Sequence, residues 1–244
     1  MILYLGIDTK KGEPDMKIHG LQKMTLLDFP GKVACTVFLG GCDLRCPFCH
    51  NSELLDASAP AEMDDAQFLA FLAKRKGLLD GVAITGGEPL LRRDLPELMA
   101  KIREMGFAVK LDTNGTHPQA LRRILDEKLA DYIAMDIKNS PDRYAETVGV
   151  PGFEIAPVLE SVSLLKAGST AFEFRTTCVA QLHDDASFEA IARWIAGAPR
   201  YFLQAFTDRD TVIFDGLSAP DDQTMRRWAE LVRPFVQQVE LRGV

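Results

Sequence analysis

Apolar runs rich in β-branched residues alternate along the chain with stretches of helical periodicity. The apolar runs cover residues 33–41, 81–87, 107–115, 130–138, 171–180 and 201–206, and the helical stretches cover 64–76, 95–105, 118–128, 155–167, 186–196 and 221–235. Repeated β–α units predict a parallel sheet with right-handed crossovers. Six units are too few for a closed eight-fold barrel and too regular for a pair of Rossmann halves. We therefore expect an α/β fold, an open partial (β/α)6 TIM-like barrel whose chemistry gathers where the strands end.

The length of 244 residues and the 47% hydrophobic content suit one sizeable core. We expect a single barrel domain over residues 33–244, preceded by an irregular lead-in over residues 1–32. Within the lead-in, the segment MTLLDFPGK predicts a short strand and a turn. A short strand near residues 239–241 is expected at an edge of the sheet or as a cap.

The formal net charge of −7 argues against a protein that binds nucleic acid through phosphates. No apolar run approaches the roughly 20 residues that a membrane helix needs. The opening residues MILYLGIDTKKGEPDMK lack the basic start, apolar core and cleavage site of a signal peptide. We expect a cytoplasmic protein with reduced cysteines, whose partners are small molecules or another protein.

Three cysteines, Cys42, Cys46 and Cys49, fall within eight residues in the run GGCDLRCPFCHN. Cys35 and Cys178 lie in apolar runs, where a lone cysteine is usually a small buried hydrophobe. Thiolates suit iron–sulfur clusters and zinc. Zinc remains the alternative because His50 follows Cys49, although zinc sites usually join two separated pairs of ligands. A cluster of four irons held by three cysteines leaves one iron open, and we expect chemistry there.

Other unusual residues also follow predicted strands, so the fold should bring them to one face. GGEP (residues 86–89) follows the second strand, DTNG (residues 112–115) ends the third, and Asp136 and Lys138 end the fourth. Paired glycines allow close approach to the backbone, and the carboxylate of Glu88 suits an ammonium group. The alternatives are a tight turn for GGEP, turn roles for Asp112 and Asn114, and a solvated ion pair for Asp136 and Lys138.

The cysteine loop, with Phe48 before its last cysteine, HN after it and GGEP further on, resembles the radical S-adenosylmethionine (SAM) superfamily. Within it, KMTLLDFPGKVACTVFLGGCDLRCPFCHN resembles the activases of glycyl radical enzymes, and most closely those of anaerobic ribonucleoside-triphosphate reductase. The resemblance implies a [4Fe-4S] cluster on the three cysteines and SAM on the fourth iron. It also implies reductive cleavage of SAM to methionine and a 5′-deoxyadenosyl radical, which abstracts hydrogen from a glycine of the partner. A low-potential donor such as flavodoxin or ferredoxin would supply the electron.

The resemblance also implies roles for single residues. Gly86, Gly87 and Glu88 would hold the amino group of SAM and Lys138 its carboxylate, while Phe48, His50 and Asn51 would lie on its adenosine side. Asp112 and Asp136 match aspartates that help to bind a monovalent cation in pyruvate formate-lyase activases, and Arg175 matches a basic residue near SAM or the target peptide. The structural alternatives for Asn51, Asp112 and Arg175 are ordinary turn or surface roles.

The chain departs from the formate-lyase activases at the end of the last barrel strand. Those proteins carry a histidine there, whereas this chain has Gln204 and Phe206. We expect an activase of anaerobic ribonucleoside-triphosphate reductase. The alternatives are an activase of another glycyl radical enzyme such as pyruvate formate-lyase, a radical SAM enzyme acting on a small molecule or peptide, and a non-enzymatic iron–sulfur electron-transfer or zinc-structural module.

Overall fold

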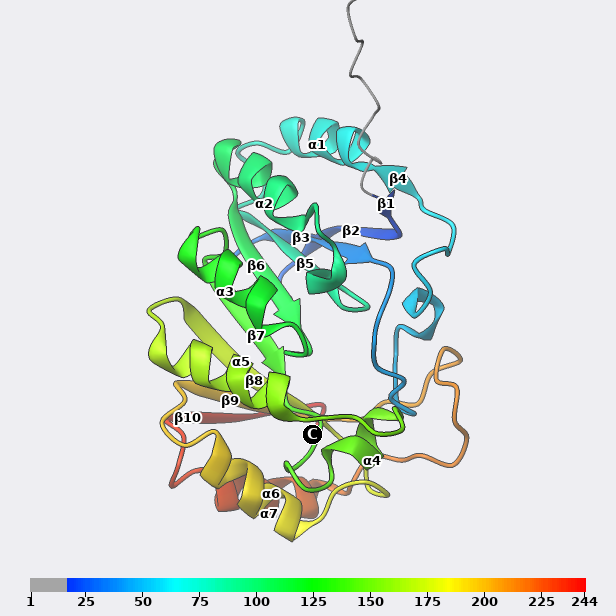
Figure 1. Cartoon of the computed structure of the whole chain (residues 1–244), viewed down its shortest axis with the longest axis vertical. Coiled ribbons are helices and arrows are strands. Elements are labelled where there is room, and N and C mark those ends of the chain that lie inside the picture. The colour runs from blue at the N-terminus through cyan, green and yellow to red at the C-terminus, as the bar shows by residue number, and fades with distance from the viewer. Residues whose placement is uncertain (1–16) are drawn as a thin grey trace, which may run out of the picture.

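The computed structural model describes residues 17–244, and its centre is one curved sheet of eight strands (Figure 1). The strand order is β10-β9-β8-β7-β6-β5-β3-β2, in which β2 runs antiparallel to β3 and the other neighbours are parallel. The strands are β2 (Gly20–Thr25), β3 (Ala34–Leu39), β5 (Gly81–Gly86), β6 (Ala108–Thr113), β7 (Tyr132–Asp136), β8 (Ala171–Cys178), β9 (Arg200–Ala205) and β10 (Gln238–Arg242). A separate short pair joins β1 (Lys17–Ile18) to β4 (Met63–Asp64).

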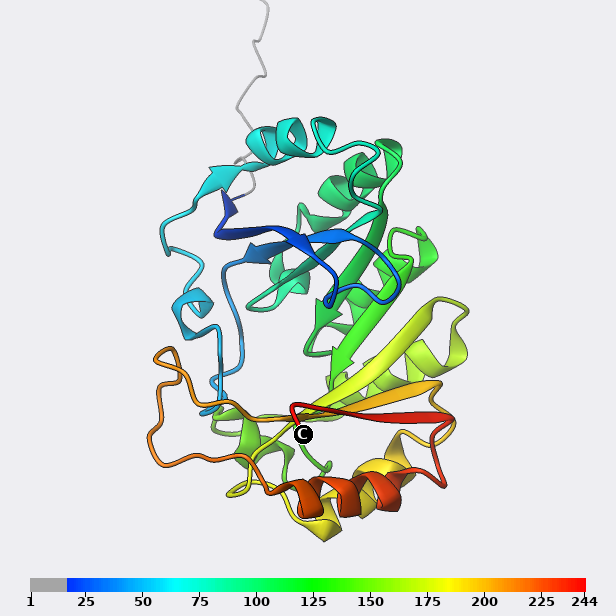
Figure 2. The same ribbon diagram turned by 180° about the vertical axis from the view of Figure 1, so that it is seen from behind.

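Helices cover the outer face of the sheet, as the two opposite views show (Figures 1 and 2). They are α1 (Asp65–Ala73), α2 (Leu95–Glu104), α3 (Pro118–Asp126), α4 (Tyr144–Val148), α5 (Ala156–Ala167), α6 (Asp185–Trp194) and α7 (Asp222–Val232). Asp64, Asp184 and Asp221 cap α1, α6 and α7 by accepting a main-chain N–H of the first turn. Among residues 17–244, no helix is long and apolar enough to cross a bilayer.

The structure confirms the α/β class and all six predicted strand–helix units. The short strand expected near residues 239–241 is β10, which pairs parallel to β9 at one edge of the sheet. The strand and turn expected in MTLLDFPGK begin within β2, at the opposite edge. Sequence analysis did not predict α4, a helix of five residues in the loop after β7. The signal-peptide argument falls on residues 1–16, outside the described residues, and the division at residue 33 stays a prediction.

The turn after β2 closes the amino-terminal end of the barrel. Phe29 is 2% exposed and packs against Ala34, at the start of β3, and Tyr132, at the start of β7. Parallel strands that start at this plugged end must all finish at the other end. The loops that follow β3, β5, β6 and β7 are therefore neighbours.

Candidate active site

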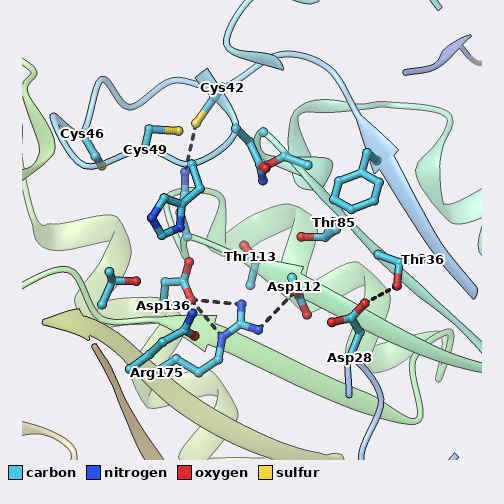
Figure 3. A pocket seen from close by; sticks show the side chains of 18 of the residues that line it. Asp28, Thr36, Cys42, Cys46, Cys49, Thr85, Asp112, Thr113, Asp136 and Arg175 are labelled. Atoms are coloured by element: carbon cyan, nitrogen blue, oxygen red, sulfur yellow. Dashed lines mark hydrogen bonds and ion pairs between the residues drawn. The ribbon is translucent and has the colours of Figure 1, made fainter. Parts of the chain in front are cut away.

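A cavity of about 510 Å³ extends along the inside of the barrel to the carboxyl ends of the strands. Figure 3 shows Cys42, Cys46 and Cys49 at one end of it and Arg175 between Asp112 and Asp136 at the other. All the candidate site residues from the sequence except Glu88 line this cavity: Cys42, Cys46, Phe48, Cys49, His50, Asn51, Gly86, Gly87, Asp112, Asp136, Lys138 and Arg175. The fold thus gathers side chains from β3 through β8 around one space.

The three clustered cysteines are free thiols on the loop after β3. Burial raises the pKa of Cys42 to about 11 and that of Cys46 to about 12, so these thiols ionise at neutral pH only when a metal binds them. The other two cysteines, Cys35 in β3 and Cys178 in β8, are fully buried in the core and lie outside the cavity lining.

The donor set suits an iron–sulfur cluster. Within residues 17–244, no three His, Cys, Asp or Glu side chains converge on a point where they would bind one metal ion. A mononuclear zinc site needs such convergence, at about 2.3 Å from each sulfur. A four-iron cluster does not, because each thiolate binds a different iron.

The cysteine loop is held by parts of the chain that are distant in sequence. The main-chain N–H of Arg45 donates to the carbonyl of Val148 at the end of α4 (2.9 Å). His50 Nε2 lies 2.7 Å from the carbonyl of Thr207, and its ring stacks on Phe206 at 5.5 Å between centroids. Burial lowers the pKa of His50. The loop after β9 therefore packs against the loop after β3, as the two adjacent loops in Figure 1 show.

Gly86 and Gly87 let the end of β5 lie against the cysteine loop. A Cβ atom at Gly86 would lie 2.2 Å from the carbonyl oxygen of Leu39, and one at Gly87 would lie 2.1 Å from that of Gly41. The N–H of Gly87 donates to Leu39 (2.8 Å) and the N–H of Glu88 to Gly41 (2.7 Å). We expected these glycines to admit a ligand, and that role stays a prediction. The structure shows that they admit the backbone of the cysteine loop.

Glu88 lies behind the cavity wall. Its side chain is fully buried, and its carboxylate accepts hydrogen bonds from the N–H of Asn114 (2.6 Å), the hydroxyl of Thr113 (2.9 Å) and the N–H of Leu90 (3.0 Å). Burial raises the pKa of Glu88 to about 7, while these donors oppose the rise. Through these hydrogen bonds, Glu88 connects the ends of β5 and β6. Direct contact between Glu88 and SAM stays a prediction.

The far end of the cavity holds a chain of alternating charges. Arg175 contacts Asp112 (Nη1–Oδ2, 3.2 Å) and Asp136 (Nε–Oδ1, 3.0 Å), Lys138 contacts Asp136 (2.8 Å), and Lys110 pairs with Asp112. Burial alone would raise the pKa of Asp136, but Lys138 and Arg175 hold it well below its usual value. Because three cations already neutralise the two carboxylates, the residues as arranged do not fit the monovalent cation expected between them.

Several cavity residues escaped the sequence analysis: Asp28, Thr36, Lys110, Thr113 and Glu173, while Asn114 was noted only as a turn residue. A signal for two of them was present. Lys110 precedes Asp112 by two residues in β6, and Glu173 precedes Arg175 by two in β8. Side chains two apart on a strand share a face, so charged pairs at this spacing in apolar strands indicate a polar barrel interior.

Comparison with known proteins agrees with the fold and the cysteine loop. The Radical SAM superfamily matches residues 36–195. A glycyl-radical enzyme activating enzyme of Methanocaldococcus jannaschii is 31% identical over 238 residues, which cover 93% of this chain and 96% of that protein. The pyruvate formate-lyase-activating enzyme of Clostridium pasteurianum is 33% identical over 131 residues, 52% of this chain and 54% of that enzyme.

Two solved structures share the fold. A radical SAM methyltransferase from Sphaerobacter thermophilus superposes with a TM-score of 0.66 at 17% identity, covering 88% of this chain and 67% of that one. Streptococcus suis SuiB bound to S-adenosylmethionine superposes with a TM-score of 0.66 at 15% identity, covering 85% of this chain and 52% of SuiB.

The expected cofactors are confirmed at the level of the family, whose members use a [4Fe-4S] cluster and SAM. The non-enzymatic alternatives, a zinc-structural or an electron-transfer module, are set aside by the same match. The chain belongs to the radical SAM superfamily and, within it, to the glycyl-radical enzyme activating enzymes.

Proposed function

We propose that this activase installs the glycyl radical of an anaerobic ribonucleoside-triphosphate reductase. The observation that carries the choice of target is the end of β9. Gln204 lines the cavity there, and Phe206 is 4% exposed against the ring of His50. The formate-lyase activases carry a histidine near this point, so the side chain that Gln204 presents to the cavity marks a difference from them. The motif-rich stretch over residues 23–51 supports the same target.

In this proposal Cys42, Cys46 and Cys49 hold the cluster at the end of the cavity where their thiols gather. When bound, the cluster and SAM supply a 5′-deoxyadenosyl radical through one-electron reductive cleavage of the sulfonium. Phe48, His50 and Asn51 line the adenosine side of the site. Phe48 is only 4% exposed and excludes water there.

The methionyl part of SAM has an amino group and a carboxylate to be bound. Gly86 and Gly87 line the cavity with main chain, which suits the amino group. Lys138 suits the carboxylate, because Asp136 raises the pKa of this lysine against the effect of burial and keeps it charged.

This radical would take a hydrogen atom from the Cα of a glycine in the reductase, which would give 5′-deoxyadenosine and leave the unpaired electron on the glycine. The electron for each cleavage comes from a low-potential protein such as flavodoxin or ferredoxin. The class of partner, a glycyl radical enzyme, follows from the family.

Anaerobic electron paramagnetic resonance tests the target. The reconstituted, reduced protein is mixed with SAM and an anaerobic ribonucleotide reductase, and we expect the doublet of a glycyl radical. The matched control is Cys46→Ala, which should give neither a doublet nor 5′-deoxyadenosine. Formation of 5′-deoxyadenosine with the wild-type chain but no doublet would refute this target, and the same assay with pyruvate formate-lyase would then test the alternative.

A further inference from the structure

Three large apolar side chains lie exposed together at the end of β2 and in the turn that follows it. The exposed fractions are 63% for Met24, 68% for Leu26 and 85% for Leu27. We call these three residues the apolar lip. Apolar side chains grouped on a surface are typical of sites where another protein binds.

The local fold holds the apolar lip in place. The hydroxyl of Thr25 accepts the N–H of Leu27 (3.2 Å) and the N–H of Asp28 (3.3 Å), which fixes the turn. On either side of Leu26 and Leu27, Thr25 is 6% exposed and Phe29 is 2% exposed. The two leucines therefore face outward because their neighbours are anchored in the core.

The apolar lip adjoins the cavity. Leu27 itself lines the cavity, together with its neighbours Thr25 and Asp28. Asp28 accepts a hydrogen bond from Thr36 inside the barrel (2.6 Å). The cavity is also lined by Arg242 of β10, the opposite edge strand, so it follows the open side of the barrel between the two edges seen in Figure 2.

We propose that the apolar lip is a docking surface for the glycyl radical enzyme and binds an apolar patch beside the loop that carries its glycine. This proposal rests on the activase function proposed above. A glycine in a folded protein reaches the cavity only if that protein covers the surface around the opening. The turn that carries the apolar lip lies at the amino-terminal end of the barrel, away from the cysteines. A partner that covers the open side of the cavity from the cysteine end as far as Leu27 therefore buries the apolar lip.

The test compares two reactions in variants of the apolar lip. Leu26→Glu and Met24→Glu alter residues that do not line the cavity, so cleavage of SAM without partner should stay within about twofold of the wild type. The concentration of partner that gives half-maximal glycyl radical should rise at least tenfold, equivalent to about 1.4 kcal/mol. The matched control is Leu78→Glu, because Leu78 is equally exposed at 64% but does not line the cavity or belong to the apolar lip.

The proposal is overturned if the half-maximal partner concentration is unchanged in the lip variants, or if it rises equally in Leu78→Glu. It is also overturned if the lip variants lose SAM cleavage without partner to the same extent. If a glutamate variant fails to fold by circular dichroism, the double variant Met24→Ala, Leu26→Ala removes the same side chains without adding charge. If the wild type activates formate-lyase but not the reductase, the proposed target is wrong and the variants are compared on formate-lyase.

Discussion

Replacing Gly87 with alanine tests whether the close approach of two loops builds the site. Gly87 does not have a positive φ, so alanine fits its backbone conformation. The added Cβ would lie 2.1 Å from the carbonyl oxygen of Gly41, and 3.0 Å is the shortest separation that such atoms normally show. The two backbones would therefore have to move apart by at least 3.0 − 2.1 = 0.9 Å.

That movement breaks the two hydrogen bonds that join the loops, from Gly87 to Leu39 (2.8 Å) and from Glu88 to Gly41 (2.7 Å). Leaving the N–H donor of each bond without a partner costs about 1–3 kcal/mol, so we expect Gly87→Ala to lower the free energy of unfolding by about 2–6 kcal/mol. The cysteine loop moves with Gly41, so iron content after reconstitution should fall as well. Urea unfolding of the metal-free protein and iron analysis measure the two effects.

The control is Gly106→Ala. Gly106 has a φ of +92°, and a Cβ there meets no atom within 4 Å. Its substitution imposes backbone strain alone, about 1–2 kcal/mol, and should leave iron binding unchanged. If Gly87→Ala costs no more than Gly106→Ala and binds iron normally, the close approach of the loops is not what requires glycine.

Further expectations concern the cysteines, Glu88 and Arg175. Cys46→Ala should abolish iron binding and SAM cleavage while circular dichroism shows a folded barrel. The control variant Cys178→Ala should keep both iron binding and SAM cleavage. Iron retained by the Cys46 variant would refute the assignment of Cys46 as a ligand. Burial raises the pKa of Glu88 from 4.5 to about 7, so the folded state binds the extra proton and stability falls as pH rises through that window, by up to about 3 kcal/mol. In Glu88→Gln, the free energy of unfolding measured with urea should change less with pH in this range. An unchanged pH dependence would contradict the argument that burial raises the pKa of Glu88. Arg175→Ala should lower the free energy of unfolding by about 3 kcal/mol, because Asp112 and Asp136 lose their shared partner. SAM cleavage by this variant should then respond to potassium more than to choline, and an equal response to both salts would contradict this expectation.

The order of the strands and helices could be read from the sequence because each unit carries its own local pattern. Apolar runs and helical periodicity predicted all six units, and aspartates marked the starts of several helices. The cysteine spacing likewise indicated a cluster without any knowledge of the fold. The helix α4 went unpredicted because five residues are too short for a periodic pattern to show.

The contacts within the site depended on long-range packing. The sequence identified Glu88, Asp112, Asp136 and Arg175 as candidates, because polar residues at strand ends stand out. Only the structure showed that the side chain of Glu88 is buried in the cavity wall, where its hydrogen bonds join β5 to β6, and that Arg175 bridges Asp112 and Asp136. These partners lie 25 to 63 residues apart along the chain, so no local pattern encodes them.

Sequence alone therefore determined the class of fold, the family and its cofactors, since each depends on short-range patterns or on motif spacing. The tertiary structure decided which charges neutralise one another, which glycines meet backbone and which apolar side chains stay exposed. The physical reason is that burial, desolvation and ion pairing depend on the neighbours that a residue acquires when the sheet curves. The leucines of the apolar lip, for example, stay exposed because they lie in the turn after β2, whereas the leucines of the central strands pack into the core.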